Sequence, residues 1–478
     1  MLTQTAYGDS RPSFWLRVRE FAVPPSMIET ATARRLAGDW AGACAAAAVD
    51  IDFNLRFVAR AHGRELAARL RADLRHLAPD LLRWHMPRIA PDGLLRPGLT
   101  ITLARYEAAR REGERPVHLV ARTPPAWADA GQRISLALWD GSRALHETGA
   151  GHHPHARPDR RFRLDLHRHL WDARRADELR IRSGAGPLTD PGPGPHRAPH
   201  RDPDPEGLVP PGLRCAVGRW AAEAGIVLRS EGGSDTQPGG TVTVRVGARR
   251  RLDLRLVPAG DGTGPPELRI TAASADARSA PLPVLPDAAT WVLPDLELLR
   301  DGLIDAERLH PLVASALVAD HAPAGPAPAA GRAGAPHLVE CRGAVHRIGL
   351  ADGVLVPLDH DPAEIRREEL LVSLTGTPLP CLQAIDAAHR RPDCLTGVRE
   401  RLDHGDTAGA LAVVEGLLGP DALLRTGALL DELERAAQRR IAYGLFRAGL
   451  AGRGPDRLPP RSPRPRGHRS HPRHTNSR

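Results

Sequence analysis

The sequence predicts an α+β protein of several domains, with helical hairpins at both ends around antiparallel β-rich modules. Three observations support this class. Apolar residues recur every three or four positions near both ends of the chain, which is the period of an amphipathic helix. The middle of the chain instead alternates apolar and polar residues over short runs, as half-buried strands do. Stretches rich in Pro and Gly separate these segments and cannot form a core.

A length of 478 residues is typical of about three domains. We expect the chain to divide into a disordered arm over 1–13, a helical domain over 14–92, an antiparallel β domain over 93–183, a Pro/Gly linker over 184–212, an α+β domain over 213–320, a second linker over 321–336, a small α+β module over 337–395, a helical domain over 396–452 and a disordered basic tail over 453–478.

The N-terminal segment is expected to be helical over residues 14–86. Pro79 should end a helix because its ring removes a backbone donor. The apolar face of that helix is predicted from residues that step by three or four, namely Leu55, Val58, His62, Leu66, Leu70, Leu74 and Leu77.

The same turn sequence occurs near both ends of the chain. Its members are Gly38, Asp39 and Ala43 in the first copy and Gly405, Asp406 and Ala410 in the second. We expect each Gly to end one helix in the left-handed conformation and each Asp to cap the next helix. Each Ala should let the two helices of a hairpin approach closely.

The first turn resembles the inter-helix turn of a tetratricopeptide-type repeat. The residues that carry this likeness are Ala33, Gly38, Asp39, Trp40 and Ala43. The second copy has Thr407 in place of the aromatic residue and Glu400 in place of the small one, and no tandem array is present. We therefore expect two isolated hairpins and no membership of that family.

Strands are expected from residue 97 onward. The runs "LTITLARY", "PVHLVARTP", "QRISLALWDG", "RFRLDLHRHLW" and "ELRIR" should form an antiparallel sheet. A short helix in "CAVGRWAAEAG" and consecutive hairpin strands in "TVTVRVGARRRLDLRLVPAGDGTGPPELRITAAS" should follow the first linker.

The C-terminal third begins with a helical pattern in "LPDLELLRDGLIDAERLHPLVASALV", followed by strand candidates in "HLVECRGAVHRIGL" and "GVLVPLD". Asp361 is expected to cap a helix, with Pro362 at its first position and Glu364 completing a capping box. The pattern is helical again over 396–447. One face of the last long helix should be buried through Leu423, Leu430, Leu433, Ala437, Ile441 and Leu445.

The basic residues are all arginine, because the chain contains no lysine. This excludes a P-loop lysine, a Schiff-base lysine and a Ser-x-x-Lys dyad. A GC-rich genome would favour arginine by itself, so the arginine content is weak evidence for nucleic-acid binding. Residues 453–478 hold eight Arg and one Asp, a charge of +7 out of the total of +9.

Two sets of side chains have the chemistry of a zinc site. One is His152, His153, His155, His167 and His169, and the other is Cys341, His346, His360 and Cys381. Neither set has the spacing of a known module. We expect His167 and His169 to lie on the solvent face of a strand and the cysteines to be small buried residues, with no metal and no cofactor.

A stripe of arginines at Arg56, Arg60, Arg64, Arg71 and Arg75 could follow phosphate groups or form a solvated helix face, and we expect the solvated face. The five cysteines are odd in number and show no framework spacing, which suggests reduced thiols in a cytoplasm. No secretory h-region and no long apolar run is present, so we expect no signal peptide and no membrane span.

No catalytic motif is present, and we identify no catalytic, cofactor-binding or metal-binding residue. We expect a cytoplasmic adaptor or scaffold that acts through contacts with a protein partner, by way of its end hairpins and sheet edges. One alternative is a nucleic-acid-associated protein that binds weakly through residues 453–478, which contain no aromatic residue on which a base could stack. The other is an enzyme whose site has no short motif.

Overall fold

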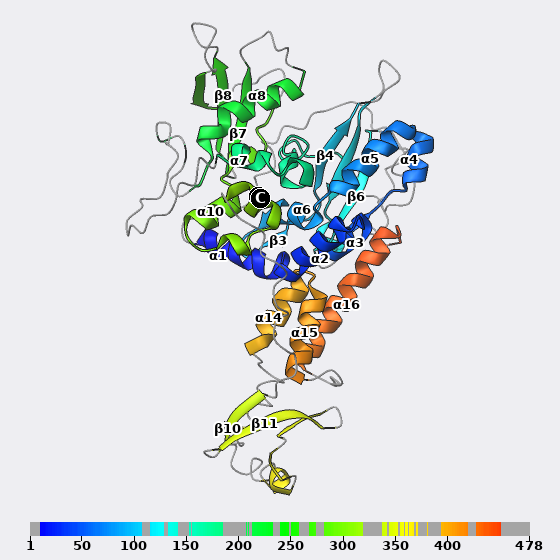
Figure 1. Ribbon diagram of the computed structural model, residues 1–478, viewed down its shortest axis with the longest axis vertical. Helices are drawn as coiled ribbons and strands as arrows, with labels where there is room; N and C mark the ends of the chain where they lie inside the picture. The colour runs from blue at the N-terminus through cyan, green and yellow to red at the C-terminus, as the bar shows by residue number, and fades with distance from the viewer. Residues whose placement is uncertain are drawn as a thin grey trace, which may run out of the picture.

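The computed structural model describes residues 10–107, 115–128, 132–141, 153, 155–184, 207, 209, 213–232, 240–247, 250–257, 267–273, 282–318, 337–341, 344–351, 354–357, 359–361, 363–367, 370, 380, 393–418 and 427–450. Helices alternate with several small sheets, most of which are antiparallel. The predicted α+β class is therefore confirmed (Figure 1).

The N-terminal part is helical, as predicted. Its elements are α1 (Ser10–Arg17), the π-helical turn η1 (Val18–Ala22), α2 (Pro25–Leu36), α3 (Trp40–Ala46), α4 (Leu55–Ala61), α5 (Arg64–His76) and α6 (Pro79–His85). The single helix expected over 55–77 is two helices, because Gly63 adopts a φ of 93° between α4 and α5.

A four-stranded sheet has the order β1-β6-β5-β4. The strands β4 (Thr100–Tyr106), β5 (Val117–Arg122) and β6 (Ile134–Trp139) are antiparallel, as the alternation predicted. The short strand β1 (Val49–Ile51) runs parallel to β6 and was not predicted. A two-stranded ribbon of β2 (Arg88–Ile89) and β3 (Leu94–Leu95) follows α6.

The strands predicted in "RFRLDLHRHLW" and "ELRIR" are wrong. The first run leads into the 3-10 turns η4 (Arg168–Leu170) and η5 (Ala173–Arg175), and the second is helix α7 (Glu178–Arg182). The chain folds back on itself here because the Trp171 indole N–H donates to the Leu164 carbonyl oxygen at 3.0 Å. The Asp172 carboxylate then accepts from the Arg174 backbone N–H at 3.1 Å, which starts η5.

One hydrophobic core joins these helices and the sheet to residues much later in the chain. It extends from Phe14 to Leu179 and continues from Ala288 to Leu317. The later residues lie in α9 (Asp287–Thr290), α10 (Pro294–Arg300) and α11 (Pro311–Leu317) and in the segments between them, which include η7 (Ala306–Arg308).

A second core lies under the predicted hairpin strands. Helix α8 (Trp220–Ser230), preceded by η6 (Val217–Arg219), packs on the sheet of β7 (Thr241–Val246), β8 (Arg250–Val257) and β9 (Glu267–Ala272). The sheet order is β7-β8-β9 and both pairs are antiparallel, so the expected hairpins are confirmed. We call the described residues from 10 to 318 the body.

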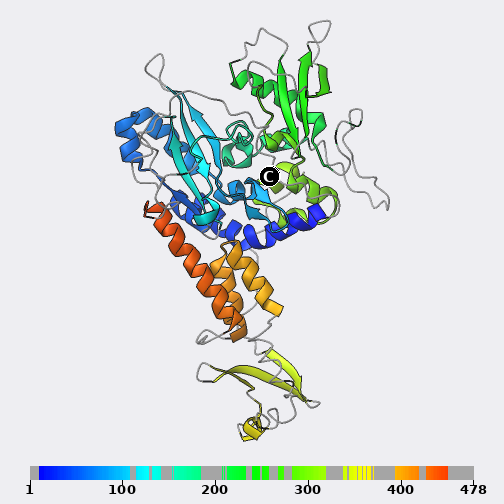
Figure 2. The same cartoon turned by 180° about the vertical axis from the view of Figure 1, so that it is seen from behind.

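The C-terminal elements stand off from the body, and we call residues 337–450 the arm (Figures 1 and 2). It contains the antiparallel strands β10 (His337–Cys341), β11 (Ala344–Ala351) and β12 (Val354–Pro357), followed by helices α14 (Asp393–Asp403), α15 (Thr407–Leu418) and α16 (Ala428–Arg447). Asp361 caps the helical turn at 363–367 as predicted, accepting from the Ala363 N–H at 2.9 Å, whereas Pro362 lies outside the described residues.

The two predicted turns are confirmed. Gly38 and Gly405 have φ angles of 78° and 84°, in the region that favours Gly. The Asp39 carboxylate accepts from the Gly42 N–H at 2.8 Å and the Asp406 carboxylate from the Gly409 N–H at 2.9 Å. Ala43 and Ala410 are fully buried between the helices of their hairpins. The sequence repeats because each hairpin needs the same backbone reversal.

Candidate functional site: the arm and its contacts with the body

The turn of the C-terminal hairpin contacts the body directly. The Arg83 guanidinium on α6 donates at 2.8 Å to the His404 carbonyl oxygen, which immediately precedes the turn. The same guanidinium donates to the carbonyl oxygens of Ala22 and Gln132. Arg83 thus joins three segments of the chain that lie far apart in sequence.

Arg83 is fully buried and has no carboxylate as a hydrogen-bond partner. Burial lowers the pKa of Arg83 to about 10, which still leaves it charged at neutral pH. A buried cation is tolerated only if its donors are satisfied, and here carbonyl groups satisfy them. The arm therefore contributes one of the oxygens on which this buried charge depends.

The His404 side chain adds a second contact at the same place. Its ring nitrogens lie 2.8 Å from the Glu400 carbonyl oxygen and 2.9 Å from that of Asp92, and its ring packs against Phe21. Burial lowers the pKa of His404 to about 4, and the Arg88 and Arg83 guanidinium groups act in the same direction. Its imidazole is therefore neutral at pH 7.

The end of α16 contacts the body at a second place, beside β1. The Tyr443 hydroxyl donates to the Asp50 carboxylate at 2.7 Å, and Arg447 forms ion pairs with Asp50 and Asp52. Arg133 also binds Asp50, with both of its hydrogen bonds at 2.7 Å. Burial alone would raise the pKa of Asp50, but the hydrogen bonds from Arg133 and Tyr443 outweigh it and lower the pKa below its ordinary value.

A small apolar cluster accompanies these polar contacts. Ala128, Tyr443 and Phe446 are buried together, and Trp127 meets the Phe446 ring edge-on at a centroid distance of 5.3 Å. The arm is thus held to the body at two separate points, the His404 turn and the end of α16. Two points of attachment fix its orientation as well as its position.

The face of α16 that was predicted to be buried is only partly covered at its start and is exposed from Ala437 onward. Its buried residues are Leu429, Glu432, Tyr443 and Phe446. Ile441 is 64% exposed and Leu445 is 41% exposed, and Ala437 one turn before them is also exposed. Leu430 and Leu433 are partly buried, and Leu423 lies outside the described residues. The prediction failed because contacts with the body, which no helical period encodes, decide which side of α16 is covered.

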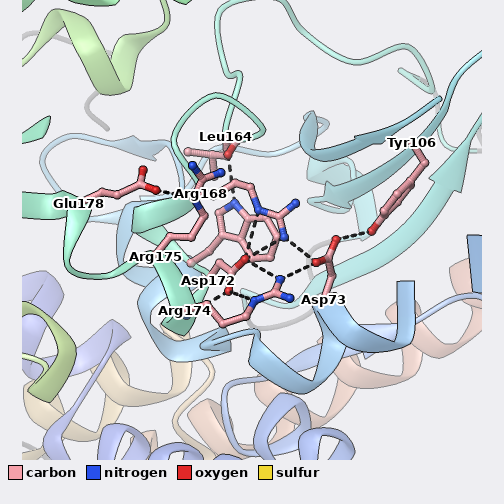
Figure 3. A network of polar contacts seen from close by, with 9 residues as sticks. Asp73, Tyr106, Leu164, Arg168, Asp172, Arg174, Arg175 and Glu178 are labelled. Carbon is pink, nitrogen blue, oxygen red and sulfur yellow. Dashed lines mark hydrogen bonds and ion pairs between the residues drawn. The ribbon is translucent and has the colours of Figure 1, made fainter. Parts of the chain in front are cut away.

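A network of arginines and aspartates inside the body could be mistaken for a site (Figure 3). Asp73 on α5 accepts from Arg168 and Arg174 at 2.6 Å each and from the Tyr106 hydroxyl at 2.7 Å. The same two arginines also bind Asp172. Burial would raise the pKa of Asp172, but the hydrogen bonds from Arg174 and Arg168 keep it below its ordinary value. Because each carboxylate is already occupied, this network joins α5 and β4 to the 163–175 loop and leaves no free acid or base.

A buried histidine–carboxylate pair in the body is also structural. His310 lies with its Nε2 2.9 Å from the Asp80 carboxylate, and both residues are almost fully buried. Its Nδ1 accepts from the Leu312 N–H at 3.1 Å and so caps α11. Only Nδ1 is hydrogen-bonded; Nε2 and both Asp80 oxygens are buried without a hydrogen-bond partner in the described part of the chain, so the pair meets at ion-pair distance without hydrogen-bond geometry.

The four described histidines of the first predicted set do not come together around one point. His153 lies with its Nε2 2.9 Å from the Thr123 carbonyl oxygen, and burial lowers its pKa to about 4. His155 is exposed, and His152 lies outside the described residues. His167 and His169 are both 1% exposed, which contradicts the solvent-facing strand predicted for them. His167 instead contacts the Glu223 carboxylate at 3.1 Å and so links the 163–175 loop to α8.

The second set is only partly described. The rings of His346 and His360 stack at a centroid distance of 4.2 Å, and the side chain of Cys341 and all of Cys381 lie outside what the structure describes. Within the described part of the chain, no group of three or more His, Cys, Asp or Glu side chains is arranged to hold a metal ion.

No protein-family model, no curated protein and no solved structure matches this chain. Among the described helices, none is both long enough and apolar enough to cross a membrane. The contacts that join the arm to the body were not anticipated from the sequence, since each links residues more than 300 positions apart. Those of Arg83 and His404 are also made to backbone carbonyl groups, which no motif marks.

Proposed function

We propose that the protein acts through protein contacts, as an adaptor or scaffold, and that the arm presents a partner-binding surface. The supporting observation is the exposed apolar stripe of Ala437, Ile441 and Leu445 along α16. Residues at i, i+4 and i+8 lie one above another on a helix, which is the spacing of the anchors in helix-in-groove recognition. The fitting partner is a protein with a hydrophobic groove.

The fixed attachment of α16 favours this use of the stripe. Tyr443 and Arg447 hold one side of the helix against the body, so Ile441 and Leu445 point away from it in a set orientation. A helix that is already folded and oriented loses less conformational entropy on binding than a flexible segment does. The odd set of five cysteines, of which Cys44 and Cys215 are buried, favours a reducing cytoplasm as the compartment.

The test is affinity capture with the full chain, followed by reconstitution with the captured protein after purification. The doubly substituted variant Ile441→Glu and Leu445→Glu should lose the partner, because two charges would have to enter its apolar groove. Leu36→Glu is the matched control, since Leu36 ends α2, outside the arm, and is 75% exposed. Equal binding by all three chains would show that the stripe is not the contact.

A titration with DNA and RNA tests the alternative function, which is nucleic-acid binding. If the 1–452 truncation binds either nucleic acid as tightly as the full chain near 150 mM salt, neither the adaptor nor the weak tail hypothesis accounts for the protein.

A further inference from the structure

A second surface with unusual chemistry lies on the β7-β8-β9 sheet. The register places Arg245 opposite Arg251 and Arg255 opposite Arg269. Side chains opposite each other in an antiparallel pair share one face, so four arginines lie on the same side of the sheet. The other side carries Val242, Val244, Leu252 and Leu254, which are buried in the second core. We call the first side the arginine face.

The arginine face is open to solvent. All four of its arginines are exposed, and Arg245, Arg251 and Arg255 form no ion pair with any residue in the described ranges. Asp253 lies between the two pairs, is 5% exposed and accepts from the Thr243 hydroxyl at 3.2 Å. At the far end, Val257 is opposite Glu267.

This arrangement has an energetic cost within the folded protein. Like charges directly opposite each other on neighbouring strands destabilise a sheet, and here this happens twice in three strands. The same face holds two acidic residues, Asp253 and Glu267, so its arginines outnumber its carboxylates by four to two. A face with a net positive charge and two like-charge pairs suits negative groups supplied from outside.

We propose that the arginine face docks an acidic segment of a partner protein. Arg251 and Arg255 are four residues apart on β8, which separates the two pairs by about 13 Å. Each pair can bind a carboxylate with its guanidinium forks. A segment with acidic residues over both pairs and a neutral residue over Asp253 therefore matches the charges along the strand.

Nucleic acid fits this face less well. The remaining positions of the face are Thr241, Thr243, Val257, Glu267 and Thr271, so none offers an aromatic ring for a base. A phosphate backbone carries a negative charge at every step and would also pass over Asp253. A protein segment can leave that position uncharged, so an acidic peptide is the better match.

This proposal goes beyond the one made for α16, and it uses none of the same residues. The arginine face and the arm lie at opposite ends of the long axis of the molecule (Figures 1 and 2). Failure of either surface in its own test therefore leaves the other standing.

The test uses the full chain and a fluorescein-labelled twelve-residue peptide of alternating Glu and Thr, with the Gln–Thr peptide as a neutral probe. Fluorescence anisotropy should detect the acidic peptide only, with binding that weakens as salt rises. Arg245→Gln, Arg251→Gln and Arg255→Gln together should weaken binding by at least about tenfold. The matched control removes three exposed arginines elsewhere, at Arg56, Arg60 and Arg64, and should bind like the native chain.

A melting experiment completes the test. The arginine-face variant should melt at the same temperature as the native chain or higher, because its like-charge pairs are gone. The proposal is overturned if the acidic peptide does not bind, if the control loses binding equally, or if the variant melts lower, which would make the arginines structural. Tighter binding of a twelve-base-pair DNA duplex that depends on the same arginines would also overturn it and identify nucleic acid as the occupant. The basic tail is identical in all three chains, so any binding through it gives the same baseline, and only the difference between the variant and the control reports on the arginine face.

Discussion

Replacing Asp73 by alanine should destabilise the body more than any other single change in the network of Figure 3. Asp73 is 6% exposed and accepts from three side chains on three different segments, Tyr106, Arg168 and Arg174. Asp73→Ala removes the only acceptor that the structure gives the Tyr106 hydroxyl. Tyr106 is 2% exposed, so water cannot readily replace that acceptor.

The magnitude follows from the burial of each partner. A buried hydroxyl left without a partner costs about 1–3 kcal/mol. The Arg168 and Arg174 side chains are 19% and 38% exposed and keep their bonds to Asp172, so losing Asp73 costs them about 1 kcal/mol together. The total loss in the free energy of unfolding should be about 2–4 kcal/mol.

Urea unfolding followed by tryptophan fluorescence measures this loss, since Trp171 is fully buried beneath Arg168. Tyr106→Phe should cost only about 1 kcal/mol, because Asp73 keeps both arginines. The double variant should cost less than the sum of the two single changes, since both remove the same hydrogen bond. The reasoning is refuted if Asp73→Ala unfolds at the native midpoint, or if Tyr106→Phe is equally costly.

Three further changes test other contacts. Gly38→Val should lower the free energy of unfolding of the full chain by about 1 kcal/mol or more, because a β-branched residue must adopt a φ of 78°; an unchanged urea midpoint would contradict the turn. Arg83→Met leaves three buried carbonyl groups without their donor, so the free energy of unfolding should fall by about 3 kcal/mol. The rate of amide hydrogen exchange in α14 should rise, and an unchanged rate would mean that the arm does not depend on Arg83. The pKa of His404 is about 4 in the folded chain, below the ordinary value of about 6.5, so the unfolded state takes up its proton first and stability should fall as the pH drops from 6.5 to 4. His404→Gln should flatten this part of the urea-midpoint profile, and an identical slope would assign it to other groups.

Local signals in the sequence predicted local structure well. The Gly-Asp turns were found at both ends because the positive φ and the cap are properties of a few neighbouring residues. The alternation of β4 to β9 was found for the same reason, since a strand with one buried face repeats every two residues. Such features need no knowledge of the rest of the chain.

Tertiary contacts decided the features that were missed. His167 and His169 alternate as a solvent face would, yet Trp171 and the Glu223 carboxylate draw their segment into the body. The exposed side of α16 was predicted to be buried because leucine and isoleucine fit the helical period, whereas Tyr443 and its acceptor Asp50 determine which side is covered. A period in the sequence shows that a face is apolar but not whether the fold covers it.

The arginine face is an intermediate case. Alternation within "TVTVRV" and "RRLDLRLV" already places Arg245, Arg251 and Arg255 on the side of their strands away from the apolar residues. That Arg245 meets Arg251, and Arg255 meets Arg269, depends on the register that each hairpin turn sets. The pairing of these four arginines into two like-charge pairs is therefore seen in the structure and could not be read from the sequence.

The rigidity of the arm connects the two proposed surfaces. When a scaffold binds two partners at once, it raises the effective concentration of each partner near the other. This effective concentration depends on how firmly the two binding sites are held in place. Here the arm is fixed at the His404 turn and at the end of α16, so the stripe and the arginine face keep a constant separation. Loosening the first attachment with Arg83→Met leaves the residues of both surfaces unchanged. It should therefore preserve the affinity of each partner measured alone and weaken only the assembly that contains both.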